Sequence, residues 1–213
     1  MVSSRRSVRA GCLSMTVGLS IAILPGTASA SRPTWSIVPA PNPVLPPGTQ
    51  SLSAVACASP TSCFAVGYVA TSAASSPLIE HWDGTVWSVS SSPSVPNGTL
   101  TGVTCLSPTS CLAVGRSGLI EQWNGNSWTV GSSPPYGSFG AVTCVATNFC
   151  FAVGSAHMFP SALIDEWNGT SWSDMSPTVT GTTSGFSSVS CSVRHCALPS
   201  EAFLQVPVMR AKP

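Results

Sequence analysis

The chain has 213 residues, with 8 Lys or Arg against 7 Asp or Glu, and only 7% of its residues are charged. A charge so sparse and so evenly balanced excludes the basic patch of a nucleic-acid-binding protein. The 18 Gly and 19 Pro, together with many Ser and Thr, predict short strands and turns rather than long helices.

Residues 1–30 have the three parts of a secretory signal peptide. Three arginines lie within residues 5–9, a mostly apolar stretch runs from 12 to 24, and Ala28-Ser29-Ala30 is a small-residue cleavage signal. We therefore expect cleavage after Ala30 and a secreted, extracellular protein. A retained membrane anchor is the alternative, although the apolar stretch is short for a bilayer span.

The export route follows from the residues around the arginine pair. Ser4-Arg5-Arg6-Ser7-Val8 resembles a twin-arginine signal. Such signals favour Phe where Val8 stands, so the general secretory route is the favoured expectation.

Eight cysteines remain once Cys12 leaves with the signal peptide, and they form four local pairs. An even number of paired cysteines in an exported chain predicts disulfides. Zinc is the alternative, but zinc-binding pairs are usually about two to four residues apart and converge with a second pair. Here each pair is wider or isolated in its own repeat, so we expect no metal. The predicted disulfides are Cys57–Cys63, Cys105–Cys111, Cys144–Cys150 and Cys191–Cys196.

The sequence repeats in register with these pairs. Each complete unit reads as four short strands: Φ-x-x-V-x-C, C-[FL]-A-V-G, L-I-[ED]-x-W and W-[ST]-[VD]. Repeated four-stranded antiparallel units predict an all-β fold, a β-propeller-like array of blades with three complete repeats and partial terminal units. The predicted repeats are residues 51–95, 99–134, 138–178 and, in part, 185–197, within a domain of residues 31–197.

Both ends of this domain depart from the repeat. Residues 34–39 match the fourth strand of a unit but precede the first strand of the array, so we expect them to complete a blade. The last unit has Ala197-Leu198-Pro199 where A-V-G is expected, and residues 198–213 form a tail without repeat character.

The repeat W-[DN]-G predicts two-residue type I′ turns between the third and fourth strands. That register places Glu80 opposite Trp87, with Glu121 and Asp165 at the same position of the next units. A row of carboxylates could serve acid–base chemistry or bind cations. The structural interpretation is favoured, because a repeated acid is spread over the units instead of converging on one cleft, and it can accept a hydrogen bond from an indole or a backbone amide.

These motifs resemble a family of secreted bacterial repeat proteins, common in actinobacteria, built on S-C-x-A-V-G followed by E-x-W-[DN]-G-x-x-W. The resemblance covers residues 34–197. It implies a kelch- or WD-like propeller and export, and it transfers no catalytic residue.

Binding residues are expected on the connections that vary between repeats. The first-to-second and third-to-fourth connections should lie at one end of each blade, and they are nearly invariant. The other two connections differ in length at the opposite end, where recognition is usual. The candidate contact residues there are Tyr68, Arg116, Tyr136, His157, Met158 and Phe159.

No catalytic motif such as G-x-S-x-G or H-E-x-x-H occurs, so we expect no catalytic, cofactor-binding or metal-binding residue. The leading interpretation is a secreted, non-enzymatic binding module for extracellular carbohydrate or protein. We expect no nucleic-acid partner, no membrane association after signal cleavage, and self-association if the ring of blades is incomplete. The alternatives are a propeller-type hydrolase or lyase acting on carbohydrate, and a truncated or degenerate repeat protein with no activity of its own.

Overall fold

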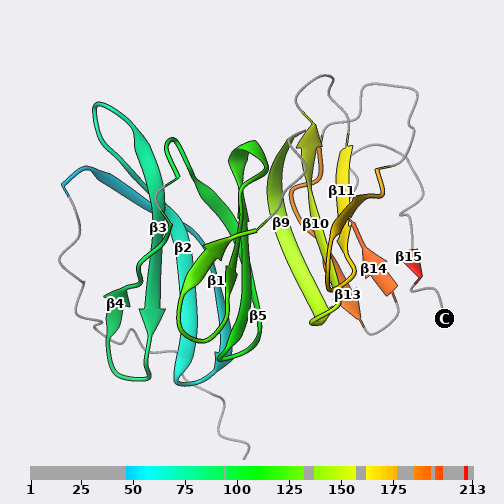
Figure 1. Cartoon of the computed structure of the whole chain (residues 1–213), viewed down its shortest axis with the longest axis horizontal. Coiled ribbons are helices and arrows are strands. Elements are labelled where there is room, and N and C mark those ends of the chain that lie inside the picture. Colours follow the sequence, from blue (N-terminus) through cyan, green and yellow to red (C-terminus); the bar gives the residue numbers. More distant parts are fainter. Residues whose placement is uncertain are drawn as a thin grey trace, which may run out of the picture. The chain divides into compact units, whose positions relative to one another are not determined.

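A computed structural model describes residues 47–93, 95–131, 137–156, 162–176, 185–192, 195–198 and 209–210. Apart from one 3₁₀ turn, every described element is a β-strand. The strands form four antiparallel sheets in chain order, which we call blades 1 to 4 (Figure 1). The predicted all-β, propeller-like array of four-stranded units is therefore confirmed.

Blades 1 and 2 are simple meanders, because neighbouring strands in each sheet are also neighbours in the chain. Blade 1 comprises β1 (Thr49–Ser59), β2 (Ser62–Ala70), β3 (Ser75–Trp82) and β4 (Trp87–Val89). Blade 2 comprises β5 (Leu100–Ser107), β6 (Ser110–Gly115), the 3₁₀ turn η1 (Arg116–Gly118), β7 (Ile120–Trp123) and β8 (Trp128–Val130).

Blade 3 repeats this order, and blade 4 has three described strands. Blade 3 comprises β9 (Gly137–Ala146), β10 (Phe149–Ala156), β11 (Ala162–Trp167) and β12 (Trp172–Asp174). Blade 4 comprises β13 (Ser190–Ser192), β14 (His195–Ala197) and β15 (Met209–Arg210). Because β15 pairs with β14, part of the predicted non-repeat tail adds a strand to blade 4. The predicted signal peptide and the predicted strand at 34–39 lie outside the described residues.

All four predicted disulfides are present, and each joins the first two strands of its blade. In blade 1, Cys57 lies directly opposite Cys63, and Ser59 opposite Ser62. Pro60 and Thr61 therefore form a two-residue turn, and the extra residue in the disulfide loop is taken up as a β-bulge. Each disulfide staples a tight hairpin, which is a local tie within one blade.

The turn between the third and fourth strands differs from the prediction. Trp82 pairs with Trp87 and Glu80 with Val89, so the loop has four residues and the predicted register is wrong. The cause is the Asp83 side chain, whose Oδ1 accepts the backbone N–H groups of Thr85 at 2.8 Å and Val86 at 2.9 Å. Only the glycine of the loop has a positive φ, so a type I′ turn does not form. Asn124 and Asn168 cap the corresponding loops of blades 2 and 3 in the same way.

Each blade has two apolar faces because side chains alternate along its strands. We call the face toward the next blade the forward face and the face toward the preceding blade the rear face. The forward face of blade 1, with Phe64, Val66 and Ile79, packs on the rear face of blade 2, with Leu100 and Val103. The forward residues of the next two blades are Leu112, Val114 and Ile120 in blade 2 and Phe151, Val153 and Ile164 in blade 3.

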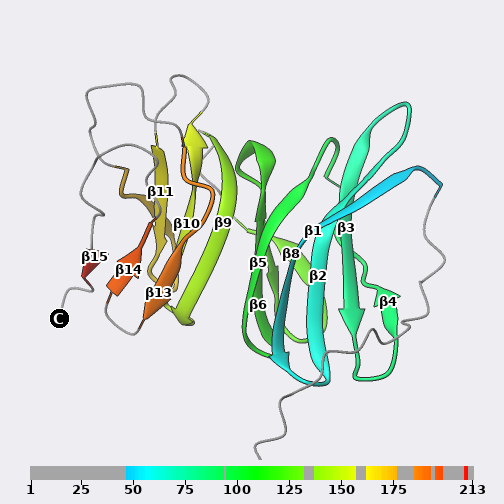
Figure 2. The ribbon, with the colours of Figure 1, turned by 180° about the vertical axis from the view of Figure 1, so that it is seen from behind.

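The first strands of the blades lie against one another, with β1 next to β5, β5 next to β9 and β9 next to β13 (Figures 1 and 2). The core is therefore a series of layers, each shared by two consecutive blades. Full burial of a Val, Leu, Ile or Phe stabilises a fold by roughly 1.5–3 kcal/mol. Each such layer buries several of these side chains, so a blade depends on its neighbours for most of its stability.

Candidate functional site

One end of the blades is held by a repeated indole hydrogen bond. The Trp82 Nε1–H donates to the carbonyl of Pro60 at 3.1 Å, and so joins the third-to-fourth loop to the tight disulfide hairpin. The corresponding bonds run from Trp123 to Pro108 and from Trp167 to Thr147, both at 3.0 Å. The two connections therefore share one end of the blade, as the sequence predicts. We call it the disulfide end.

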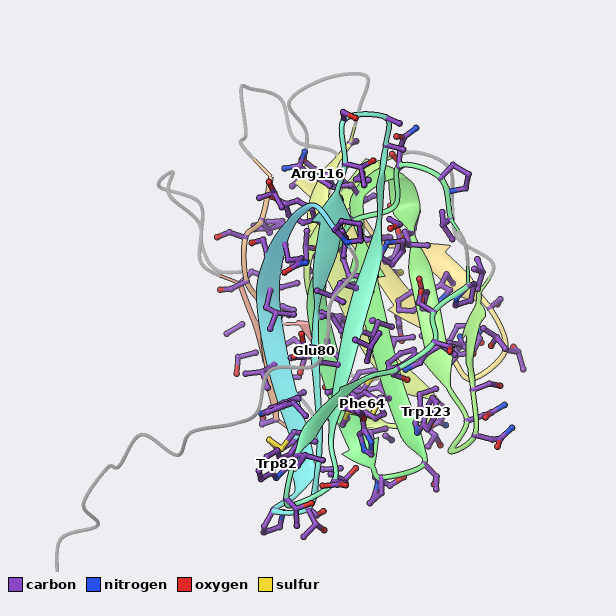
Figure 3. The ribbon with its side chains drawn as sticks, turned by 90° about the vertical axis from the view of Figure 1, so that its left-hand side faces the viewer. Phe64, Glu80, Trp82, Arg116 and Trp123 are labelled. Carbon is purple, nitrogen blue, oxygen red and sulfur yellow. A yellow bond between two sulfur atoms is a disulfide. The ribbon has the colours of Figure 1, made fainter. Side chains whose placement is uncertain are left out.

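Of the predicted contact residues, Arg116 lies at the opposite end of the blades (Figure 3). Arg116 is exposed in η1, on a connection as the sequence predicts. Tyr68 is not on a loop, because β2 extends through it and pairs it with Pro77. The predicted loop placement of Tyr68 is therefore wrong. The connection between β2 and β3 is confined to residues 71–74, so Tyr68 belongs to the strand. The remaining candidates, Tyr136, His157, Met158 and Phe159, lie outside the described residues, so a binding role for this end stays a prediction.

The three recurring acids lie on the rear faces of their blades and are buried. Glu121 is fully buried, and its two carboxylate oxygens accept hydrogen bonds from the Ser92 hydroxyl at 2.9 and 3.0 Å. Both oxygens of Asp165 are buried, and no described residue makes a hydrogen bond to them. The expected bond from an indole does not occur among the described residues. The indoles on the third strands donate to the hairpin carbonyls instead, and the buried Nε1 atoms of Trp128 and Trp172 on the fourth strands have no described partner.

Burial raises the pKa of all three acids. Loss of solvation raises the pKa of Glu121 to about 7, although the Ser92 hydrogen bonds act in the opposite direction. Burial, with a smaller contribution from the nearby carboxylate of Asp174, raises the pKa of Asp165 to about 6. Burial also raises the pKa of Glu80. Each acid lies in a different blade, so the three carboxyl groups do not converge on one cleft.

The rear face of blade 1 differs from the rear faces of the next two blades in how much of its apolar surface is exposed. Leu52 is 48% exposed and Val55 is 62% exposed. The equivalent positions are nearly closed in blade 2, where Leu100 is 0% and Val103 is 9% exposed. In blade 3 they are occupied by Phe139 and Val142, which are buried in the same way. Among the described residues, the same apolar positions are thus covered by a preceding blade twice and uncovered once.

A groove of about 470 Å³ marks this open face. Its lining includes the apolar side chains of Leu52, Val55 and Ala65, together with Glu80 and Trp87. Figure 3 looks onto this side of the molecule and shows Glu80 between the two ends of the blade. The arrangement can accept an apolar surface together with one hydrogen-bond donor for the carboxyl group.

Sequence reasoning missed this surface. The available signal was the repeat alignment itself, because Leu52 and Val55 occupy positions that the later units fill with Leu100 and Val103. The alignment shows that the face is apolar in every blade. It does not show which copy of the face has a neighbour.

Two features are absent from the described ranges. No three His, Cys, Asp or Glu side chains converge there to hold a metal ion. Nor does that part of the chain contain a helix long and apolar enough to cross a bilayer.

Comparison with known proteins supports the assignment of the fold and nothing beyond it. No protein-family model and no curated protein matches the chain. The solved structure described as YCF48 bound to D1 peptide is similar over 77% of this chain and 56% of that one, with a TM-score of 0.53 and 11% identity. Two structures of Sqt1 from Chaetomium thermophilum each match 73% of this chain, with TM-scores of 0.54 and 0.51 and 12% identity.

These neighbours are propeller-type proteins, so the fold and the repeat together define a propeller-type protein of four-stranded blades. The chain spans 56% of the YCF48 chain and 42–43% of the Sqt1 chains.

Proposed function

We propose that this chain is an exported, non-enzymatic binding module that docks a partner protein on the rear face of blade 1. The observation that carries the proposal is the exposure of Leu52 and Val55 at positions that are buried in the two following blades. Contiguous exposed apolar surface marks interaction sites on soluble proteins. The predicted signal peptide, the four disulfides and the resemblance to secreted repeat proteins support export.

The two covered interfaces indicate what the partner looks like. In both, the covering forward face has Phe or Leu directly after the second cysteine, Val two residues later and Ile on the third strand. A surface of this composition fits the rear-face residues it meets. The partner that best fits the open face is therefore another four-stranded blade with the C-[FL]-A-V-G signature.

A second copy of this chain fits less well. Its forward faces on blades 1 to 3 are already buried against the next blade. In blade 4 the matching position is Ala197, which is small and exposed. The partner is thus a different polypeptide, which offers a free forward face of its own.

The carboxyl group of Glu80 adds a polar requirement. At the next interface, Glu121 is satisfied by Ser92, which belongs to the connection between blade 1 and blade 2. No described residue takes the place of Ser92 at Glu80. A partner blade with a serine in the same connection would satisfy Glu80 and exclude water from the groove.

The test uses the full exported chain as immobilised bait against the extracellular proteins of the source organism. We expect it to retain proteins that carry the C-[FL]-A-V-G and W-[DN]-G signatures. The variant V55D should reduce this retention at least tenfold, because a buried unpaired carboxylate costs more than the about 1.4 kcal/mol that a tenfold change represents. V130D is the matched control, since Val130 is a similarly exposed valine (53%) outside the groove.

Circular dichroism of both variants checks that they fold. The proposal is refuted if nothing is retained, if the retained proteins lack the signature, or if V55D and V130D retain the same amount as the natural chain.

A further inference from the structure

The blades share a second feature, which lies near the disulfide end of each interface. The residue after the second cysteine and the residue opposite it on the third strand both point toward the next blade. Between blades 1 and 2 these residues are Phe64 and His81, whose rings stack with centroids 4.5 Å apart. The Phe64 ring also contacts Trp123 and Trp128 of blade 2, both with centroids 5.1 Å away. Aromatic rings therefore fill this space.

Blade 2 departs from that pattern. Its residues at the two positions are Leu112 and Gln122, which pair across β6 and β7. Neither has a ring. In blade 3 the first position again has an aromatic ring, Phe151, whose centroid is 5.1 Å from that of Phe149. Both positions are described in blades 1 to 3, and of these three blades only blade 2 has no aromatic ring after the second cysteine.

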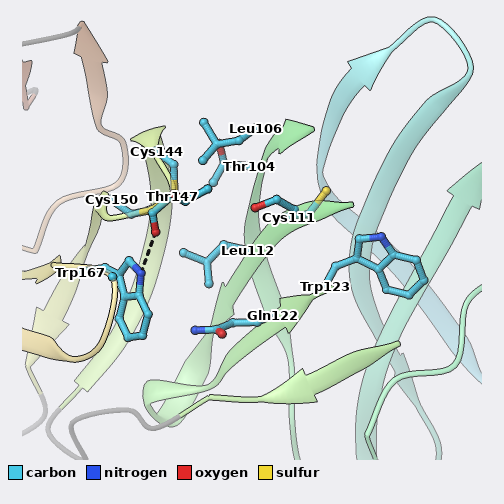
Figure 4. A pocket seen from close by; sticks show the side chains of 12 residues that line it. Thr104, Leu106, Cys111, Leu112, Gln122, Trp123, Cys144, Thr147, Cys150 and Trp167 are labelled. Carbon is cyan, nitrogen blue, oxygen red and sulfur yellow. Dashed lines mark hydrogen bonds between the residues drawn. A yellow bond between two sulfur atoms is a disulfide. The ribbon is translucent and has the colours of Figure 1, made fainter. Parts of the chain in front are cut away.

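A cavity of about 150 Å³ lies where the ring is missing, and it opens at the disulfide end. Leu112 and Gln122 point toward Trp167 of blade 3 across it, while Trp123 points away (Figure 4). The Trp167 indole is fixed, because its N–H already donates to the Thr147 carbonyl at 3.0 Å. The indole ring, and not its polar hydrogen, is therefore what faces an incoming group.

The size and chemistry of the cavity define its ligand. An engineered apolar protein cavity of about 150 Å³ holds one benzene molecule. Here the apolar lining includes Leu106, Leu112, Trp167 and disulfide sulfur, which suits an aromatic ring in the edge-to-face contacts that Phe64 makes one interface earlier. Gln122 and Thr104 supply hydrogen-bonding groups beside it, and no described residue makes a hydrogen bond to the Gln122 side-chain amide.

We infer that the pocket between blades 2 and 3 binds a tyrosine side chain of a protein ligand. The phenol ring occupies the space that the Phe64 and His81 pair fills between blades 1 and 2, and its hydroxyl reaches Gln122. This site is separate from the rear face of blade 1 and lies at an interface that the chain itself completes.

The test uses the full chain and N-acetyl-tyrosinamide as the probe, with binding followed by ligand-observed NMR and calorimetry. We expect saturable binding with a dissociation constant of roughly 1 mM, as suits a ligand of this size. The double variant L112F/Q122H recreates the ring pair of blade 1 inside the pocket. It should weaken binding at least tenfold. E166H introduces the same histidine at the equivalent position of blade 3, outside the pocket, and should leave binding unchanged.

A direct measurement does not depend on how the variants fold. Nuclear Overhauser contacts should connect the probe ring to the methyl groups of Leu112 in the natural chain. The inference is overturned by absence of saturable binding, by ring contacts elsewhere, or by binding that survives in folded L112F/Q122H. Preferential binding of N-acetylglucosamine in the same pocket would also overturn it, and would assign the pocket to a sugar ring.

Discussion

The buried acid of blade 2 should make the stability of the fold depend on pH near neutrality. Burial raises the pKa of Glu121 to about 7 from an ordinary value of 4.5, so the folded state keeps its proton where the unfolded chain has lost it. Between these pH values the folded state binds more protons, and the free energy of unfolding therefore falls as the pH rises. At about 1.4 kcal/mol for each pH unit, Glu121 removes about 3 kcal/mol between pH 4.5 and pH 8.

The substitution E121Q tests this magnitude. Glutamine keeps the shape of the side chain and an oxygen that can accept from the Ser92 hydroxyl, and it does not ionise. We expect E121Q and the natural chain to be about equally stable at pH 5. At pH 8, E121Q should be more stable by up to about 3 kcal/mol.

Urea denaturation at pH 5 and pH 8, followed by tryptophan fluorescence with the disulfides intact, measures the difference. Asp165 contributes a loss of the same sign, because burial raises its pKa as well. D165N is therefore a useful parallel variant. It should remove the loss of stability with pH that Asp165 causes and leave the loss that Glu121 causes. If E121Q loses as much stability as the natural chain between pH 5 and pH 8, then Glu121 is not protonated in the folded state and the reasoning fails.

Two further predictions concern the ties within single blades. Replacing Cys105 and Cys111 together by serine should lower the free energy of unfolding by about 2.4 kcal/mol, as expected for a closed loop of about seven residues. Urea denaturation measures it, and a loss above about 4 kcal/mol would show that the disulfide ties more than one hairpin. The substitution W82F removes the hydrogen bond to Pro60 and should cost about 1 kcal/mol or more in the same assay. An equal loss in W87F, which breaks no hydrogen bond among described residues, would assign the effect to ring packing instead.

The sequence was sufficient to predict the blades, because their determinants are local. Alternating apolar residues, paired cysteines and glycine-containing turns each act within a few residues, and the predicted disulfides follow from that spacing. The loop after the third strand was predicted wrongly for a local reason as well. The pattern predicts Asp83 as a backbone turn residue, whereas its side chain accepts two backbone N–H groups and holds a longer loop. Two turn geometries compete for the same Asp-Gly pair, and the pattern does not decide between them.

The candidate sites could not be predicted in the same way. Variation between repeats predicts binding at the loops around Arg116, since variable connections on a fixed scaffold are usual binding sites. Whether Val55 is covered depends on the presence of a neighbouring blade, which is a tertiary property. A strand face that is apolar in every repeat has the same pattern in the sequence whether it is buried or open.

Repetition within the chain provides its own reference for both proposed sites. The rear faces of blades 2 and 3 are buried, so comparison with them shows which residues of blade 1 are left exposed. The residues that cover those two faces indicate the composition of a partner surface. The ring pair of Phe64 and His81 likewise describes what the pocket beside Leu112 and Gln122 lacks. In each case the chain contains both the filled and the unfilled version of one interface. At the pocket, L112F/Q122H converts the unfilled version into the filled one at the same positions of the repeat, so a change in binding can be assigned to the missing rings.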